Sequence, residues 1–228
     1  MTDQLSQIEA ISILPQHYET VYRGSFKHDS PEQSRTNMAG EMIQVLREGI
    51  PNPWILGIGT GPQSMEKQLF AHQGQQVRDL LGKFKLVTLD VAKIGGAILL
   101  ARNKYGVEHV RADANLLPYP DNRFGLVDSN MAIDFLPRSA YRELTRVLSP
   151  GGVALLHFHH PSMLPDDMGI VKNETVRKFW QYLRDNGILF RSASEIRWGL
   201  GEAGLVVKKV TLATDGRDKW WEVMAHKE

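Results

Sequence analysis

The chain has 228 residues, no cysteine and a formal net charge of +1, with 42% hydrophobic and 23% charged residues. This length and composition suit one globular domain with a sizeable core. The lack of cysteine excludes disulfides, thiolate catalysis and cysteine-ligated zinc, and the balanced charge gives no reason to expect nucleic acid or a membrane as a partner. Residues 1–9 lack the apolar core of a signal peptide, and no apolar run approaches the roughly 20 residues of a membrane span, so we expect a cytoplasmic protein.

The first 50 residues are expected to form a helical lead-in or lid, with residues 51–228 as the main domain. Strands and helices then alternate along the chain, and the last two strands are joined by Asp215-Gly216 as an antiparallel hairpin. The predicted helices are 38–46, 65–81, 94–103, 139–148, 171–186 and 194–203. The predicted strands are 54–58, 86–89, 107–110, 125–129, 153–158, 205–212 and 220–225. This order predicts an α/β fold: a Rossmann-like three-layer sandwich with a seven-stranded, mostly parallel sheet and a C-terminal antiparallel hairpin.

Residues 54–62 (WILGIGTGP) form a short apolar run that breaks into alternating glycines. The pattern indicates a buried strand that feeds a tight turn, because glycine tolerates positive φ and has no Cβ to hold a ligand away. The next predicted strand ends at Asp90. A glycine turn after one strand and an acid at the tip of the next are typical of a nucleoside-binding site.

The turn does not fit a nicotinamide-binding motif, which needs Gly-x-Gly-x-x-Gly. Counted from Gly57 the sixth position is Pro62, and counted from Gly59 it is Ser64. A nicotinamide-dependent reductase therefore remains only a third hypothesis for this chain.

Two further segments carry a family resemblance. Residues 107–127 (VEHVRADANLLPYPDNRFGLV) resemble the region between strands three and four of the class I S-adenosylmethionine-dependent methyltransferases of the small-molecule type. Residues 141–152 (YRELTRVLSPGG) are similar to the helix and turn before their fifth strand. The similarity runs from about residue 54 to 158 and, more weakly, through the hairpin. It implies S-adenosylmethionine as cofactor and methyl transfer as activity.

The chain departs from the family pattern at three positions. The family usually has an acid where this chain has Gly57, often a glycine in place of Gln63, and usually an aspartate in place of Gly125. The missing acid matters most, because in the family it helps to hold the methionine end of the cofactor. These departures support a second hypothesis, a binding or regulatory protein of the same fold with lost or weakened catalysis.

The resemblance assigns the cofactor site residue by residue. The glycine turn would bring backbone amides to the cofactor, Asp90 would accept hydrogen bonds from the ribose hydroxyls, and Asp113 with Ala114 would contact adenine. Asp90 could instead cap the next helix. Arg35 could pair with the cofactor carboxylate, and the tip of strand four would lie beside the sulfonium. The predicted cofactor-binding residues are Gly57, Ile58, Gly59, Thr60, Gly61, Asp90, Val91, Asp113, Ala114, Ser129, Asn130 and Arg35.

Catalysis needs chiefly a positioned acceptor, and a base helps where the acceptor is a hydroxyl or a protonated amine. His157 and His159 end the fifth strand on the same side, and histidine titrates near neutral pH, so both are candidate bases. Asp134, after the fourth strand, is another candidate. The histidines could equally lie on a surface loop. A metal site is the weakest alternative, because no acid is adjacent in sequence, and we predict no metal.

Aromatic residues are candidates for the acceptor pocket, although ordinary helix packing explains each of them equally well. The predicted substrate-contacting residues are Tyr18, Tyr22, His160, Trp180 and Trp198. The leading hypothesis is methyl transfer to an oxygen or nitrogen of a small molecule, with a specialised metabolite or a peptide as plausible acceptors. The expected partners exclude nucleic acid and membrane, and the chain is expected to be a monomer or homodimer.

Overall fold

The computed structural model describes residues 31–61, 69–70, 75–91, 107–164, 174–185 and 188–228. These residues form a seven-stranded sheet in the order β3-β2-β1-β4-β5-β7-β6, in which β7 runs antiparallel to β5 and β6 and the other pairs are parallel. The strands are β1 (Trp54–Ile58), β2 (Lys85–Asp90), β3 (Glu108–Arg111), β4 (Phe124–Asn130), β5 (Leu148–His159), β6 (Leu205–Asp215) and β7 (Asp218–Lys227). The predicted fold class is confirmed.

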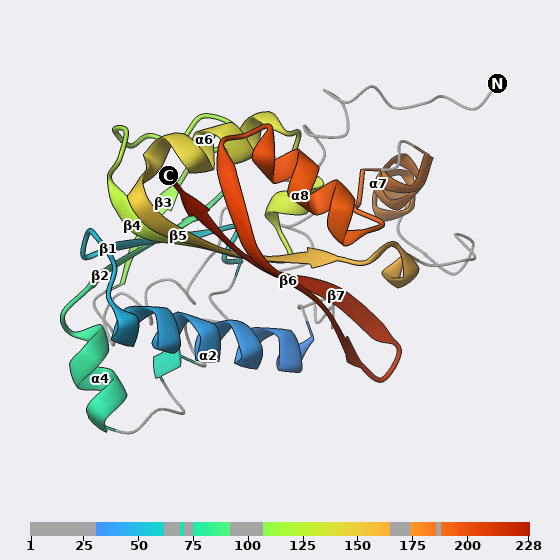
Figure 1. Cartoon of the computed structure of the whole chain (residues 1–228). Helices are drawn as coiled ribbons and strands as arrows, with labels where there is room; N and C mark the ends of the chain where they lie inside the picture. Colours follow the sequence, from blue (N-terminus) through green and yellow to red (C-terminus); the bar gives the residue numbers. More distant parts are fainter. Residues whose placement is uncertain (1–30, 62–68, 71–74, 92–106, 165–173, 186–187) are drawn as a thin grey trace.

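Helices cover both faces of the sheet (Figure 1). The helices α2 (Glu32–Glu48) and α4 (Gln75–Leu81) lie on one face, and α6 (Ser139–Val147) and α8 (Ala193–Gly201) lie on the other. The helix α7 (Glu174–Asp185) lies to one side, and short 3₁₀ turns follow β4 (η1, Ile133–Phe135) and β5 (η2, Pro161–Met163). None of the helices in these described ranges is both long and apolar enough to cross a bilayer.

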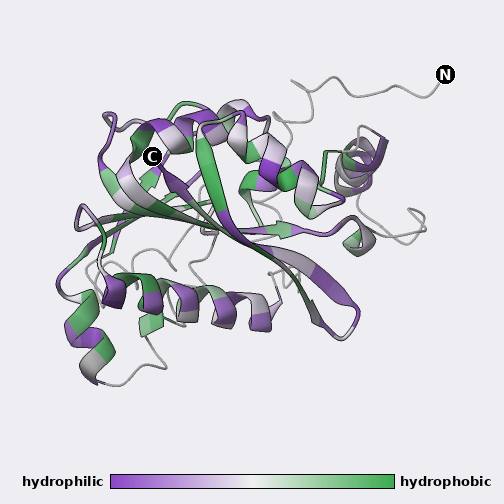
Figure 2. Ribbon diagram, viewed as in Figure 1, coloured by the Kyte–Doolittle hydropathy of each residue, from purple (hydrophilic) through white to green (hydrophobic). Residues whose placement is uncertain are grey.

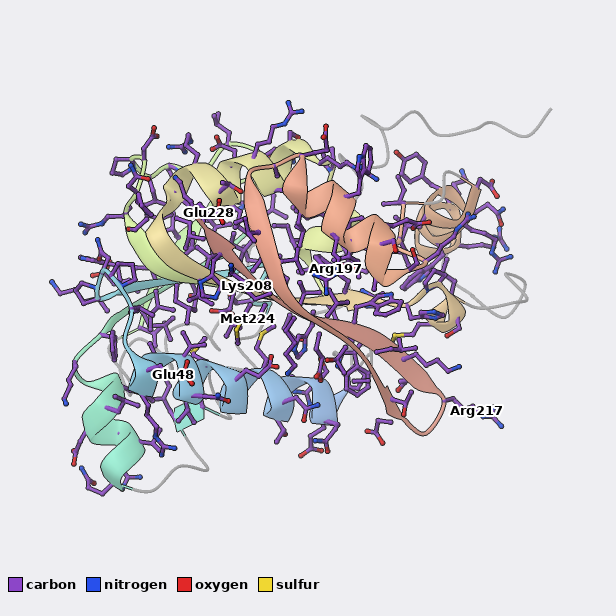
Figure 3. All side chains as sticks on the ribbon, in the orientation of Figure 1. Glu48, Arg197, Lys208, Arg217, Met224 and Glu228 are labelled. Carbon is purple, nitrogen blue, oxygen red and sulfur yellow. The ribbon has the colours of Figure 1, made fainter. Side chains whose placement is uncertain are left out.

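Each central strand sends alternate side chains into two apolar clusters. In β1, Leu56 and Ile58 join the cluster on the α6 and α8 side, while Ile55 joins the cluster on the α2 and α4 side. In Figure 2, α2 carries bands of both hydrophobic and hydrophilic residues, as expected for a helix with one buried side. Met224 of β7, labelled in Figure 3, packs against the α2-side cluster.

Several boundaries differ from the predicted ones. The helix predicted from residue 38 begins at Glu32. Its residues before Met38 are polar, so they lack the apolar spacing on which the prediction depended. The strand predicted from residue 153 begins at Leu148: Leu148 pairs with Phe124, and the ladder resumes at Val153 after an excursion through Gly151, whose φ is 72°. The helix predicted over 94–103 lies outside the described residues, as do 65–68 and 71–74 of the helix predicted over 65–81, whose last part is α4.

Candidate active site

The glycine turn after β1 folds back onto the tip of β2. Gly59 and Gly61 have φ values of 66° and 50°, which favour glycine. The backbone N–H of Gly59 donates to the carbonyl of Leu89 at 2.8 Å, and that of Gly61 donates to Oδ2 of Asp90 at 2.8 Å. A Cβ on Gly59 would overlap the side chain of Ala132. The turn and the carboxylate of Asp90, which is 4% exposed, therefore form one unit.

The loop after β3 carries the predicted adenine-binding pair. Oδ1 of Asp113 accepts from the backbone N–H of Asn115 at 2.8 Å and from its side-chain amide at 2.9 Å, and Ala114 is buried. Two residues on, Leu116 is 76% exposed, which is unusual for a large apolar side chain beside a candidate binding loop. Val91, predicted to pack on adenine, is half-buried, and its carbonyl accepts from Nε of Arg111.

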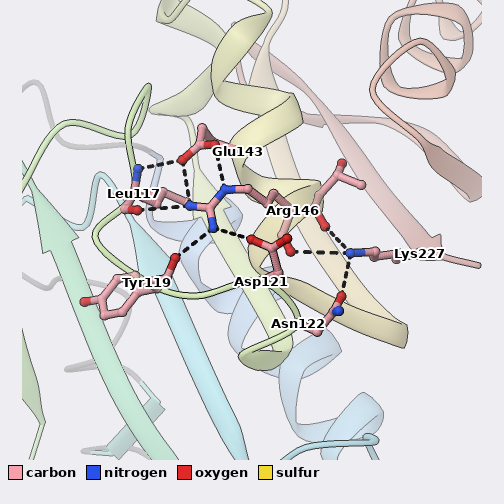
Figure 4. A network of polar contacts seen from close by, with 8 residues as sticks. Leu117, Tyr119, Asp121, Asn122, Glu143, Arg146 and Lys227 are labelled. Carbon is pink, nitrogen blue, oxygen red and sulfur yellow. Dashed lines mark hydrogen bonds and ion pairs between the residues drawn. The ribbon is translucent and has the colours of Figure 1, made fainter.

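Arg146 of α6 holds the rest of this loop in place (Figure 4). Its guanidinium donates to the carboxylates of Glu143 and Asp121, each at 2.8 Å, and to the carbonyls of Tyr119 at 2.8 Å and Leu117 at 3.0 Å. The hydrogen bond from Arg146 is the main cause that lowers the pKa of Glu143 below its ordinary value. The loop that presents Asp113 is thus fixed from its far end.

The first turns of α2 pack against the tip of β4. Oγ of Ser34 donates to Oδ1 of Asn130 at 2.8 Å and lies 2.9 Å from Nδ1 of His157. Oγ of Ser129 accepts from the backbone N–H of Ile133 at 3.2 Å, which fixes the start of η1. Arg35, predicted to meet the cofactor carboxylate, follows Ser34 and is half-buried in the same turn of α2.

His157 is fully buried beneath α2. Its Nε2 lies 3.6 Å from Oε2 of Glu41, and Oε1 of that carboxylate accepts from Nζ of Lys209 at 2.8 Å. Next to it, the side-chain amide of Asn37 donates to Glu222 at 2.6 Å. These contacts favour a role for His157 in holding α2 on the sheet rather than the predicted role of base, because a base has to reach the acceptor.

His159 and Asp134 form a closely bonded pair at the edge of the sheet. Oδ2 of Asp134 accepts the backbone N–H of His159 at 2.6 Å and lies 3.0 Å from its Nδ1. The Asp134 side chain is 1% exposed and that of His159 is 12% exposed. The imidazole stacks on Phe135, with 4.6 Å between ring centroids, and meets Trp180 edge-on at 6.5 Å. The structure therefore brings together three predicted residues, Asp134, His159 and Trp180.

Two other predicted substrate residues, His160 and Trp198, have different partners. Nδ1 of His160 accepts from the backbone N–H of Ser162 at 3.1 Å, so this imidazole caps η2, and Trp198 is 60% exposed with the guanidinium of Arg138 4.6 Å above its ring. Tyr18 and Tyr22 lie outside the described residues. In the part of the chain that the structure describes, no group of three metal-ligating side chains comes together.

Sequence reasoning missed three residues that the structure places in or beside this site: Ser34, Glu41 and Asp128. Ser34 and Glu41 lie on α2, and polar residues on a helix normally indicate a solvated side. Asp128 was a detectable signal, because a carboxylate inside an otherwise apolar strand is rarely buried without a function.

A methyltransferase domain model matches residues 56–156. A ubiquinone/menaquinone biosynthesis C-methyltransferase (UbiE) of Azotobacter vinelandii is 33% identical over 112 residues, which cover 47% of this chain and 43% of that protein. A malonyl-[acyl-carrier protein] O-methyltransferase of Halorhodospira halophila is 30% identical over 148 residues, which cover 60% of this chain and 47% of that protein. The chain thus spans less than half the length of these curated relatives.

Solved structures share the fold over nearly the whole chain. The 1,6-didemethyltoxoflavin-N1-methyltransferase of Burkholderia thailandensis, solved with bound 1,6-didemethyltoxoflavin and S-adenosylhomocysteine, superposes with a TM-score of 0.71 at 13% identity, covering 100% of this chain and 92% of that one. The [4+2]-cyclase SpnF superposes with a TM-score of 0.61 at 15% identity, covering 94% of both chains.

The sheet order defines a Rossmann-like fold, in which the glycine turn is bonded to an acid at the tip of β2. Residues 56–156 are thus similar to a methyltransferase domain, and the chain shares its fold with a methyltransferase solved with S-adenosylhomocysteine bound.

Proposed function

We propose that this protein transfers a methyl group from S-adenosylmethionine to an oxygen or nitrogen atom of a small molecule. The observation that carries the proposal is the glycine turn, whose Gly61 amide is bonded to the buried carboxylate of Asp90 at the carboxyl ends of β1 and β2. In open α/β sheets, ligands bind at this edge of the strands. The named relatives that transfer methyl groups support the same activity.

The charges at this edge suit a cationic cofactor. Among the described residues, the buried carboxylates at this edge include Asp90 at the end of β2, Asp128 near the end of β4 and Asp134 in η1, each at most 4% exposed. S-adenosylmethionine carries a sulfonium and an ammonium group and no phosphate. A site for a phosphorylated nucleotide would need the opposite charge pattern, with cations or several free backbone amides toward the ligand.

The proposed cofactor-binding roles are those that the family resemblance implies. Asp90 would accept from the ribose hydroxyls, and Asp113 with Ala114 would hold the adenine edge. The exposed Leu116 and the half-buried Val91 supply apolar surface for the adenine faces. At the other end, Ser129 and Asn130 would lie beside the sulfonium. Arg35 on α2 would reach the carboxylate.

His159 is the proposed base. The cofactor supplies an electrophilic methyl group on sulfur, and the acceptor atom attacks it in line with its lone pair. Because Asp134 occupies Nδ1, the nitrogen of His159 that can take the acceptor's proton is Nε2. On methylation of the acceptor, Nε2 of His159 would take up the proton that the acceptor atom loses. Phe135 and Trp180, which contact the imidazole, would form an apolar wall for the acceptor.

Calorimetry with S-adenosylmethionine and S-adenosylhomocysteine tests the binding half of the proposal. We expect micromolar binding to the wild-type protein and at least roughly tenfold weaker binding to Asp90→Asn, since a hydrogen bond to a charged group contributes about 1.5–3 kcal/mol. Asp79→Asn on the exposed side of α4 is the matched control and should bind as the wild type does. Binding of a nicotinamide dinucleotide in place of these ligands would contradict the proposal.

The transfer half is tested with ¹³C-methyl-labelled cofactor and a panel of phenols, carboxylic acids and amines. The ¹³C shift of the product separates oxygen, nitrogen and carbon methylation. A heteroatom product is expected, and a carbon-methylated product would contradict the choice of atom. Tight cofactor binding without turnover of any acceptor class would favour the alternative of a methyltransferase-fold binding protein, which the absence of a side chain at Gly57 supports.

A further inference from the structure

Gly57 has a buried carboxylate as its neighbour on the adjacent strand. In the parallel ladder, Gly57 lies between Thr88 of β2 and Asp128 of β4. Residues in register on neighbouring parallel strands send their side chains to the same side of the sheet. The carboxylate of Asp128 therefore stands beside the position at which Gly57 has no side chain.

The side of the sheet follows from the strand alternation. Ile55 and Leu126, which also pair with each other, belong to the α2-side cluster, so Gly57 and Asp128, two residues further along, face α2 as well. One row beyond Asp128, the side chain of Asn130 is bonded to Ser34 of α2. Asp128 is thus one row beneath the strand tip, under the first turns of α2, and it is 1% exposed.

A carboxylate this deeply buried is costly to keep ionised, and each positive charge near it offsets part of that cost. The glycine turn that follows Gly57 lies at the same edge, between Asp90 on β2 and Asp128 on β4. A ligand whose ribose meets Asp90 and whose tail runs across β1 would bring the charge at the end of that tail toward β4.

We propose that Asp128 binds the α-ammonium group of the cofactor's methionine part, from the neighbouring strand, in place of an acid at position 57. This inference rests on the proposed function, because it takes S-adenosylmethionine as the ligand. The exchange is physically simple, because Asp128 is in register with Gly57 on the neighbouring strand.

The test compares two ligands that differ only in the amino-acid tail. S-adenosylhomocysteine carries the ammonium group, and methylthioadenosine lacks it. Asp128→Asn keeps the shape of the side chain and removes its charge. We expect it to weaken S-adenosylhomocysteine binding roughly 10- to 100-fold, and to leave methylthioadenosine binding within about twofold of the wild type. Asp79→Asn is the control, and thermal unfolding checks that each variant is folded.

A second variant moves the acid back. Gly57→Asp combined with Asp128→Asn should recover most of the lost affinity for S-adenosylhomocysteine. Equal weakening of both ligands, no weakening of either, or no recovery in the double variant would overturn the inference. If the wild-type protein binds neither ligand, the proposed function itself fails, so the two failures are distinguishable.

Discussion

The carboxylate of Asp134 accepts the backbone N–H of His159 at 2.6 Å and lies 3.0 Å from Nδ1 of the same residue. One buried oxygen thus fixes both the main chain and the ring of His159. Since a carboxylate is an acceptor, the ring must carry its proton on Nδ1 when neutral, and Nε2 then carries the lone pair. The stacking on Phe135 fixes the ring plane further.

This geometry predicts both a tautomer and a kinetic effect. In ¹⁵N NMR spectra at alkaline pH, neutral His159 should be the Nδ1–H tautomer, and Asp134→Asn should weaken that preference. His159→Gln should lower kcat roughly 100-fold, the lower end for loss of a general base. It should change cofactor affinity by less than about twofold. His226→Gln, at the opposite end of the β5–β7 ladder, is the control. An unchanged kcat would exclude His159 as the base.

The backbone around Gly125 leaves no room for the side chain that the family usually has at this position. A Cβ at this position would overlap the carbonyl oxygen of Asn52 and lie 2.8 Å from its backbone nitrogen. Because backbone cannot rotate away as a side chain can, Gly125→Ala should destabilise the fold by about 1–3 kcal/mol. Gly40→Ala, on an exposed position inside α2 with open space around it, should stabilise by about 0.5–1 kcal/mol. Urea unfolding measures both, and equal effects would contradict the clash.

The fold was predictable because its signals are local. Alternating strands and helices, the Asp215-Gly216 turn and the acid at the end of β2 are all visible within short windows of sequence. The polar contacts of α2 were not, since Ser34 and His157 are 123 residues apart in the chain and meet only through packing. The same holds for Gly57 and Asp128: their pairing depends on a strand register that no periodicity encodes.

Replacement of Ser34 measures how much its hydroxyl contributes to holding α2 on the sheet. Its hydroxyl contacts both Asn130 and His157 in a fully buried position. Ser34→Ala removes these partners without adding volume, so it should destabilise the fold by about 1–3 kcal/mol. Thr36→Ala is the matched control: its hydroxyl bonds to the carbonyl of Glu32 on the exposed side of the same helix, and its loss should cost less than about 0.5 kcal/mol. Similar losses for both variants in urea unfolding would argue against the buried network.

We expect replacement of Arg146 to lower both the stability of the fold and the affinity for adenine. Lysine has one compact ammonium group and cannot replace a fork that bonds two carboxylates and two carbonyls. Arg146→Lys should therefore destabilise the loop that carries Asp113 and weaken methylthioadenosine binding severalfold, although Arg146 is not itself assigned to the cofactor. Arg142→Lys, exposed on the same helix, should change neither quantity. Calorimetry with methylthioadenosine and urea unfolding provide the two measurements.

The carboxyl group of Glu41 is expected to cause part of the loss of folding stability at low pH. Burial alone would raise the pKa of this carboxyl group, but hydrogen bonds and charge from His157 and Lys209 outweigh burial and hold the pKa below the ordinary value of 4.5. The unfolded chain then binds the proton more readily than the folded chain, so stability rises with pH across this range. The contribution of Glu41 is fully present above pH 4.5 and is lost as the pH falls through the lowered pKa of the folded state.

The free energy of unfolding is measured from roughly pH 7 down to pH 3, a range that spans both states of the carboxyl group. As the pH is lowered, this free energy should fall less steeply for Glu41→Gln than for the wild type. The difference between the two curves isolates Glu41 from the histidines, such as His109, whose pKa is lowered by burial. Glu174→Gln removes a carboxylate paired with Lys178 on the exposed side of α7 and should leave the curve almost unchanged, because solvent screens that pair. A wild-type curve parallel to that of Glu41→Gln would show that α2 is not held by this charge.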